Sequence, residues 1–288
     1  MGEAVSEWPK RVTVGDFIAD SSGVGEDRIT VKLTGWDDMP PVRVSVVDRS
    51  QQDGGWGSAG FFGSRVVGID GVVLADDPAT AKATADELRS LSPRSTHTLT
   101  VDNDYTGARS CEVYVQAGAV LDWMDGSSFT YALQVVAPDP LLYGPPVSLS
   151  TTLAGIAGTG RVWPRVWPRD WGVPAGTTPG AVTVPNAGTA TYWPVLRIDG
   201  PVINPVVTVN ETGDWVRINR TVLAGQWLDI DAANRRVMLN GSVSLAGAVT
   251  YSGRWLGIPP GGASLSWNAD TADAAARLTI NGFEGAYL

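Results

Sequence analysis

Paired aspartates are the clearest set of side chains in this sequence that could carry out chemistry. A glycoside hydrolase needs two carboxyl groups about 5 to 9 Å apart across a sugar cleft. Every aspartate pair here falls at a predicted turn or strand end, where Asp usually accepts hydrogen bonds from backbone N–H groups. Turn formation is therefore the favoured role, and glycoside hydrolysis is kept as an alternative. The pairs are Asp37 and Asp38, Asp76 and Asp77, Asp102 and Asp104, Asp122 and Asp125, and Asp229 and Asp231.

Histidine and cysteine are too scarce to build a familiar catalytic or zinc site. The chain has one histidine, His97, and one cysteine, Cys111. No G-x-S-x-G segment offers a serine for the histidine to activate, and zinc would need two or more carboxylates beside these two residues. Cys111 alternates with valines in SCEVYVQ, which predicts a buried thiol on a strand. We expect His97 to be structural or at the surface.

A glycine pattern in GGWGSAG resembles a nucleotide-binding motif in spacing only. Gly55, Gly57 and Gly60 follow G-x-G-x-x-G, but a dinucleotide site needs a strand before this motif and a helix after it. Here DRSQQD precedes and FFGSR follows, so we predict a mobile loop between strands. We expect no enzyme activity, no catalytic residue and no cofactor. No metal site is predicted either, although an ion bound by oxygen atoms is left open.

The segment RVWPRVWPRDW, residues 161–171, repeats a tetrad with tryptophan. Its two prolines remove backbone donors and disfavour helical conformation in the residues before them, so we predict an extended chain. Trp163, Trp167 and Trp171 then point to one side of the backbone. Such an edge either stacks on sugars or bases, or packs against a domain or a neighbouring subunit.

The charge balance argues against a duplex DNA-binding protein. The formal net charge is −9 and the pI is near 4.6, whereas DNA affinity depends on clustered cations that neutralise phosphates. An acidic surface would suit a wall that DNA slides past, because like charges repel. We also expect no signal peptide, no membrane contact and synthesis in a reducing cytoplasm, since the N-terminus lacks an apolar core and no run approaches about 20 apolar residues.

Short alternating segments separated by glycine and proline predict a mainly β protein with one short helix. In the first half, Asp77 is expected to cap a helix that starts at Pro78 and ends before Pro93, with its apolar stripe on a sheet. The strands predicted in this half are 28–34, 42–49, 64–75, 97–102, 110–116 and 129–137.

The second half predicts a two-sheet sandwich of the jelly-roll type. Its most legible hairpin has Leu228 and Ile230 before a turn and Val237 and Leu239 after it. We predict a first domain over 1–145, a connector rich in Pro, Gly and Trp over 146–184, and the sandwich over 185–288. The second-half tryptophans are expected mainly in the core, with a carbohydrate platform as the alternative for some of them: Trp193, Trp215, Trp227, Trp255 and Trp267.

The order of these features resembles the siphophage distal tail protein family. In the first half the resemblance is carried by RITVKLT, GGWGSAGFFGSRVVGIDGVVLADDP, DELRSL, LTVDNDYTGARSCEVYV and above all YALQVVAPDPLLYG. In the second half it is carried by NAGTATYWPVLRIDGPVINPVVTV, LAGQWLDIDAANRRVMLNG and GRWLGIPPGGASLSW. The last segment has Gly-Gly-Ala where the family commonly has Asn. The resemblance covers nearly the whole chain.

This resemblance implies a structural virion protein, a minor tail protein of the tail tip or baseplate. In the family, N-terminal domains form a ring, usually hexameric, that continues the tail tube, and DNA passes through it. The C-terminal domain is a galectin-like sandwich. The implied partners are further copies of the chain, the tail tube protein, the tape-measure protein and the tail-tip hub protein.

The resemblance also assigns roles to two tryptophan-containing segments. Trp56, Phe61 and Phe62 are expected to contact a neighbouring subunit, which would explain aromatic residues in a loop exposed to water. Trp163, Trp167 and Trp171 are expected to pack as a connector strap on a domain or subunit. The alternative to a ring component is an adhesin that binds a host surface glycan through the C-terminal sandwich.

Overall fold

The computed structural model describes residues 11–20, 28–153, 180–273 and 275–288. Their contacts divide the chain into two compact units, Met1–Gly144 together with Leu288, and Pro145–Tyr287. Both units are built mainly from antiparallel strands, which confirms the predicted fold class. The predicted connector over 146–184 begins and ends in strands of the second unit, β13 and β14, and its part over 154–179 lies outside the described residues.

The first unit is built on one sheet with strand order β2-β1-β9-β10-β11-β8-β3. Alternate residues of its strands are buried, as the sequence pattern predicts for a sheet with one covered face: Val67, Ile69 and Val73 are buried on β8 while Asp70 is exposed. The strands are β1 (Arg11–Val14), β2 (Phe17–Asp20), β3 (Arg28–Thr34), β8 (Arg65–Leu74), β9 (His97–Asn103), β10 (Gly107–Trp123), β11 (Ser128–Ala137) and the short β12 (Leu142–Tyr143) beside β10.

Helix α1 (Pro78–Ser90) contacts this sheet as predicted. Asp77 is the N-cap, and its carboxylate accepts hydrogen bonds from the backbone N–H groups of Ala79 and Thr80 at 2.7 and 3.0 Å. The buried stripe consists of Ala81, Ala85 and Leu88. These residues recur at helical spacing and therefore share one face.

The strand β10 is shared between two partners along its length. Its first half pairs with β9, and its second half pairs with β11. Between β11 and β12 the chain turns at Pro138–Asp139–Pro140, where the Asp139 carboxylate accepts hydrogen bonds from the Leu141 N–H and the Tyr143 hydroxyl. Asp139 therefore closes the corner between the two prolines.

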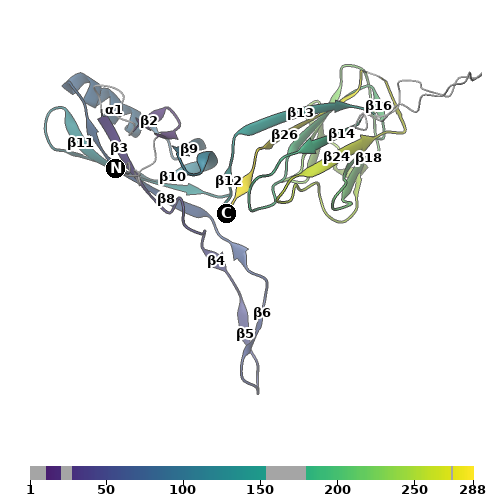
Figure 1. Cartoon of the computed structure of the whole chain (residues 1–288), viewed down its shortest axis with the longest axis horizontal. Coiled ribbons are helices and arrows are strands. Elements are labelled where there is room, and N and C mark those ends of the chain that lie inside the picture. Colours follow the sequence, from purple (N-terminus) through teal and green to yellow (C-terminus); the bar gives the residue numbers. More distant parts are fainter. Residues whose placement is uncertain (1–10, 21–27, 154–179, 274) are drawn as a thin grey trace, which may run out of the picture. The chain divides into compact units, whose positions relative to one another are not determined.

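Between β3 and β8 the chain forms an arm, residues 35–64, that leaves the sheet (Figure 1). Its strands β4 (Val42–Arg43) and β5 (Val46–Asp48) pair with β7 (Phe61–Phe62) and β6 (Gly55–Gly57), and with no other described strand. The strand predicted over 42–49 is thus broken into two short pieces. The glycine pattern predicted to lie in a mobile loop instead contributes β6, because the arm folds back on itself as a ribbon.

The root of the arm is held by Arg65, a buried cation at the start of β8. Its side chain is 1% exposed. Nη1 donates to the carbonyl oxygens of Trp36 and Asp38 at 2.7 and 2.6 Å and to that of Gly35 at 3.2 Å. Nε donates to the Pro140 carbonyl at 3.1 Å. One guanidinium therefore joins both ends of the arm to the Pro138–Pro140 corner.

The chain approaches itself so closely at this root that only glycine fits at position 35. Gly35 has a φ of +78°, and a Cβ there would lie 2.2 Å from the Val66 carbonyl oxygen. Any other side chain would both strain the backbone and collide with β8. The turn at Gly35 leads directly into Trp36, which is buried beside Arg65.

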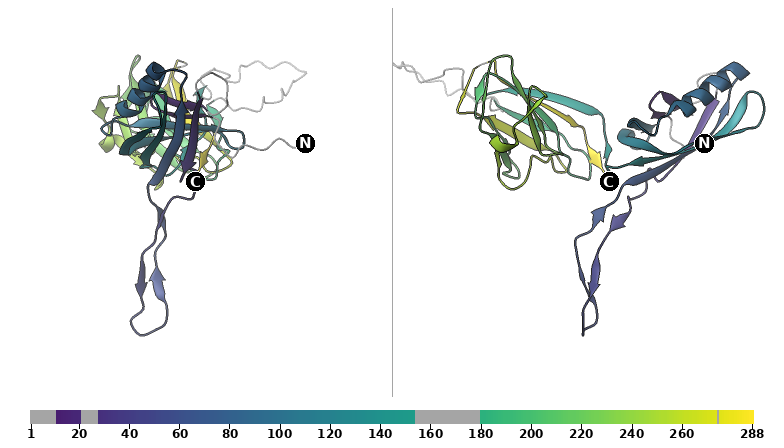
Figure 2. Two further views of the ribbon diagram at one scale, coloured as in Figure 1. Left: turned by 90° about the vertical axis from the view of Figure 1, so that its left-hand side faces the viewer. Right: turned by 180° about the vertical axis from the view of Figure 1, so that it is seen from behind.

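The second unit is a two-layer sandwich (Figure 2). One sheet has the order β13-β26-β15-β20-β21-β22, the other β14-β24-β17-β18-β23, and a small sheet contains β19-β16-β25. The strands are β13 (Pro146–Thr152), β14 (Ala181–Val184), β15 (Val195–Asp199), β16 (Val202–Ile203), β17 (Val206–Val209), β18 (Trp215–Ile218), β19 (Thr221–Val222), β20 (Trp227–Asp231), β21 (Arg236–Leu239), β22 (Val243–Ser244), β23 (Val249–Tyr251), β24 (Ala263–Asn268), β25 (Thr271–Ala272), β26 (Arg277–Phe283) and β27 (Ala286–Tyr287), with a short 3-10 helix at Ala246–Ala248.

The predicted hairpin of the second unit is confirmed in its register. Leu228 lies opposite Leu239 and Ile230 opposite Val237, and all four side chains are buried. Cross-strand apolar pairs of this kind stabilise a sheet by about 0.2 to 1 kcal/mol each.

Two buried polar side chains connect the start of the sandwich to its last strands. The Asn186 side chain donates to the carbonyls of Ala190 and Ile258 and accepts from the N–H groups of Gly188 and Ala286. The Tyr192 hydroxyl lies 3.0 Å from the Phe283 carbonyl. These contacts explain the segment NAGTATYWP, since its polar residues satisfy backbone groups that would otherwise be buried without partners.

Replacing Arg65 by leucine should destabilise the first unit by about 3 kcal/mol, because four carbonyl groups lose a charged donor at once. Urea unfolding followed by tryptophan fluorescence measures this loss. Arg94→Leu, at an exposed position after α1, is the matched control and should change stability by less than about 0.5 kcal/mol. Equal stability of the two variants would contradict the assigned role of Arg65.

The Cys111 thiol should be unreactive in the folded protein. It is buried on β10, and burial raises its pKa to about 12, so the nucleophilic thiolate is scarce at pH 8. The thiol should react with Ellman's reagent only after denaturation. Because the folded pKa is raised, the associated stability is present below about pH 8.5 and is lost as the pH rises toward 12. Rapid reaction of the native protein would show that Cys111 is accessible.

Candidate subunit-contact arm and C-terminal pocket

The predicted contact residues all lie on the arm, and none is covered. Trp56 is on β6 and is 68% exposed, while Phe61 and Phe62 form β7 and are 67% and 36% exposed. Large aromatic side chains are normally among the most buried in a protein. Their exposure together on one projecting ribbon marks a surface that suits a partner.

The opposite strand of the arm adds valines that the sequence analysis did not assign to a contact. Val42, Val44, Val46 and Val47 are all more than half exposed. The alternation in VRVSVVD predicts a strand with one apolar face. Val46 and Val47 are adjacent, however, and place apolar side chains on both faces of the strand. This departure from alternation is the signal that could have identified a contact surface. The apolar surface of the arm therefore includes both of its strands.

Trp56 has one partner within the arm. The guanidinium carbon of Arg49 lies 4.7 Å from the centre of the Trp56 ring, which is within the range of a cation–π contact. This contact fixes one face of the indole and leaves the rest of the side chain open. The other predicted tryptophan site, with Trp163, Trp167 and Trp171, lies outside the described residues.

The side chains considered for catalysis are scattered. His97 Nε2 donates a hydrogen bond to the Ser92 carbonyl at 2.9 Å and lies 3.3 Å from the Ser95 hydroxyl, both in the turn before β9. Within the described ranges, no group of three or more His, Cys, Asp or Glu side chains is placed to hold a metal ion. The contacts around His97 are those of a turn.

Several of the paired aspartates bind backbone or side-chain groups of their own turns. Asp125 accepts from the Ser127 N–H, and Asp231 accepts from the Asn234 N–H and side chain. The hydrogen bond from the Ser127 N–H lowers the pKa of Asp125, and hydrogen bonds from the Thr80 hydroxyl and the N–H groups of Thr80 and Ala79 lower the pKa of Asp77. A depressed pKa keeps a carboxyl ionised at neutral pH, whereas the acid of a glycosidase needs a raised one.

The tryptophans of the second unit differ in burial. Trp255 and Trp267 are 6% and 3% exposed, whereas Trp193 is 44% exposed. Trp227 lies under the Arg197 guanidinium at 4.5 Å and donates through Nε1 to Asp229. Core packing therefore holds for Trp255 and Trp267, and Trp193 presents its indole to solvent.

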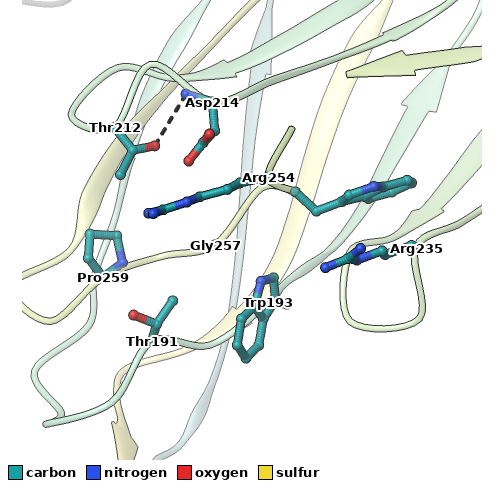
Figure 3. A pocket seen from close by; sticks show the side chains of 9 residues that line it. Thr191, Trp193, Thr212, Asp214, Arg235, Arg254, Gly257 and Pro259 are labelled. Carbon is teal, nitrogen blue, oxygen red and sulfur yellow. Dashed lines mark hydrogen bonds between the residues drawn. The ribbon is translucent and has the colours of Figure 1, made fainter. Parts of the chain in front are cut away.

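Trp193 borders a pocket of about 400 Å³ in the second unit (Figure 3). Its walls come from separate turns that meet on the outside of the sandwich. Two arginines and one aspartate supply the charge, two threonines supply hydroxyl groups, and two tryptophans supply aromatic surface. The lining residues are Thr191, Trp193, Thr212, Asp214, Arg235, Arg254, Trp255, Gly257 and Pro259.

Comparisons with known proteins bear on both units. Residues 187–281 match the family described as siphovirus-type tail component, C-terminal domain. The crystal structure of SPP1 Dit, described as a paradigm of the hub adsorption apparatus in phages that infect Gram-positive bacteria, aligns with 96% of this chain and 99% of its own at 14% identity and a TM-score of 0.59. A chain of the phage P2 baseplate in its activated conformation with Ca aligns over 96% and 99% at 10% identity and a TM-score of 0.50.

No curated protein matches the sequence significantly. Within the described ranges, no helix has the length and hydrophobicity that crossing a bilayer requires. At 14% identity the alignment with SPP1 Dit shows a shared fold over both units, and the family match is made by sequence over most of the second unit. The resemblance to siphophage distal tail proteins is thereby confirmed: residues 187–281 match the siphovirus-type tail component family by sequence, and both units share the fold of SPP1 Dit.

Proposed function

We propose that this tail component assembles into a closed ring, a hexamer by the family resemblance, that joins the tail tube to the tip or baseplate hub. The observation that carries the proposal is the uncovered apolar surface of the arm, with Trp56 and Phe61 about two-thirds exposed. Removing apolar surface from water yields about 25 cal/mol per Å². An arm that cannot cover this surface itself gains most from a neighbouring copy.

The geometry of an arm is compatible with a ring. A projecting ribbon and the surface that receives it are different parts of the chain, so each copy can place its arm on the next copy in a heterologous contact. Heterologous contacts repeat from copy to copy and form a ring when the rotation closes. The described arm strands pair only with one another, which leaves their apolar side chains free for such a contact.

The remaining parts of the proposal concern the path of DNA and the partners. A net charge of −9 suits a ring through which DNA passes without binding, because an acidic wall repels phosphate. The ring would contact the tail tube protein, the tape-measure protein and the tail-tip hub protein. It would assemble in the host cytoplasm and remain in the virion at the tail tip, acting as a scaffold and not as an enzyme.

A second candidate function is recognition of a host surface glycan by the C-terminal sandwich. The observation that favours it is the pocket beside Trp193, which combines an exposed indole with hydroxyl and charged side chains. Small-ligand pockets combine apolar surface with a few polar groups that fix orientation. A ring component can perform this function at the same time, since the arm and the pocket belong to different units.

Replacing Trp56, Phe61 and Phe62 together by serine should weaken ring formation and leave each chain folded. The change removes the largest apolar side chains of the arm without touching its root. Light scattering at increasing protein concentration, with negative-stain images of the same samples, should show rings of the unchanged protein and mainly single chains of the variant.

A matched control replaces three exposed apolar residues of the second unit, Ile203, Leu223 and Val243, by serine. This variant should form rings as the unchanged protein does, because its loss of apolar surface lies outside the arm. Rings of equal stability in both triple variants would contradict the proposed role of the arm.

A further inference from the structure

The pocket beside Trp193 has walls whose orientation is fixed by a single backbone bridge. Tyr192 and Ile258 exchange hydrogen bonds at 3.2 and 2.8 Å, and both side chains are fully buried. Side chains alternate along extended chains, so Thr191, Trp193 and Pro259 face outward into the pocket. Figure 3 shows them along one side of it.

Gly257 lets the exposed indole lie directly on the backbone. A Cβ at this position would be 3.2 Å from Trp193 Nε1 and 3.0 Å from Thr191 Cγ2. Both contacts are tighter than a real side chain normally makes, so a larger residue would push Trp193 out of place. The indole is thus held at a fixed position with part of its surface open.

Two cations and one anion line the pocket. Arg235 and Arg254 are exposed, and neither forms an ion pair with a described residue. Together with Asp214 they give the lining a net charge of +1, from two arginines and one aspartate, in a chain whose net charge is −9. A local positive excess on an acidic protein favours an anionic ligand.

Arg235 occupies a backbone conformation that its side chain does not favour. Its φ is +52°, in the left-handed region where Asn and Gly are at home and other residues are strained. The turn over Asp231–Arg236 would form at lower cost with Asn at this position. Strain kept at one residue fits a function for its side chain, and the Arg235 guanidinium borders the pocket beside Trp193 (Figure 3).

Asp214 and the two threonines make the site unsuited to a simple polyanion. Asp214 accepts a hydrogen bond from the Ser252 hydroxyl at 3.3 Å and keeps acceptor capacity on its carboxylate. Thr191 and Thr212 offer hydroxyl groups. A carboxylate beside hydroxyls suits the hydroxyl groups of a sugar, whereas a chain of phosphates would be repelled by it.

We propose that this pocket binds a saccharide that carries an anionic substituent, a carboxylate or a phosphate. The sugar ring packs on Trp193, the anion lies between Arg235 and Arg254, and Asp214 accepts hydrogen bonds from hydroxyl groups. The inference rests on the second candidate function, glycan recognition by the sandwich, and specifies its site and the charge of its ligand. The pocket volume of about 400 Å³ falls within the roughly 300 to 1,000 Å³ of small-ligand sites.

Isothermal titration calorimetry of the full chain tests the proposal with four probes: glucuronic acid, glucose 6-phosphate, glucose and inorganic phosphate. The acidic sugars should bind with dissociation constants of about 1 mM, because one ring makes few contacts. Glucose and phosphate alone should each bind at least about fivefold more weakly. Raising the salt concentration should weaken the acidic sugars only.

Two variants remove the cations one at a time. Arg235→Asn and Arg254→Ala should each weaken the acidic sugars about fivefold, the size expected for an ion pair that stays partly exposed. Arg235→Asn should be at least as stable to heat as the unchanged chain, since Asn tolerates its backbone conformation. Arg236→Ala removes the same charge one residue away, outside the lining, and should leave binding unchanged.

The outcomes separate this inference from the function on which it rests. Weakened binding in both pocket variants, with the Arg236 control unaffected, supports the proposal. Equal binding of glucose and the acidic sugars, unchanged in the variants, overturns the anionic site and leaves glycan recognition standing. Phosphate binding as tightly as the acidic sugars overturns the saccharide part. Absence of binding by every sugar overturns both.

Discussion

The buried guanidinium of Arg65 holds the root of the arm together, and the projection of the arm from the sheet depends on this root. Arg65 has carbonyl partners from two segments: the first turn of the arm, at Gly35, Trp36 and Asp38, and the Pro138–Pro140 corner after β11. Burying a cation is costly unless its donors are satisfied, and here backbone oxygens satisfy most of them. The result is a fixed root from which a ribbon can project without a supporting layer. Gly35 and Trp36 complete the root, because only a residue without Cβ permits the close turn and the side chain of Trp36 is buried.

The two units handle apolar surface in opposite ways. In the second unit the two sheets pack against each other and bury their apolar side chains. The side chains of Asn186 and Tyr192 form hydrogen bonds with backbone groups where strands meet. The first unit covers one face of its sheet with α1 but leaves the arm uncovered. When large apolar side chains stay exposed on one ribbon of an otherwise well-packed chain, the surface that covers them lies outside that ribbon.

Much of this architecture follows from sequence patterns, and the rest does not for identifiable reasons. The hairpin with Leu228 and Val237, the Asp77 cap and the buried stripe of α1 depend on local spacing, and all three are present as predicted. Arg65 gave no such signal, because its partners are carbonyl groups that any residue could supply. The arm was expected as a strand and a loop. Alternating apolar residues predict that one face of a strand is buried, but they do not show whether the same chain or another one buries it. The pocket joins residues from turns far apart in sequence, and Arg235 stands where turn propensities predict Asn or Gly.

Backbone carbonyl groups compensate the buried charge of Arg65, and this affects how the fold responds to pH and salt. Its hydrogen-bond acceptors are carbonyl oxygens, which neither titrate nor attract counterions, and the described residues give it no carboxylate partner within ion-pair distance. An anchor made from a permanent cation and fixed dipoles keeps its strength when acidity changes, since arginine stays protonated. Mobile ions do not reach a buried contact and therefore screen it little. The hydrogen bonds that attach the arm to its sheet thus depend little on pH and ionic strength, although the Asp37 and Asp38 carboxylates also act on the guanidinium electrostatically.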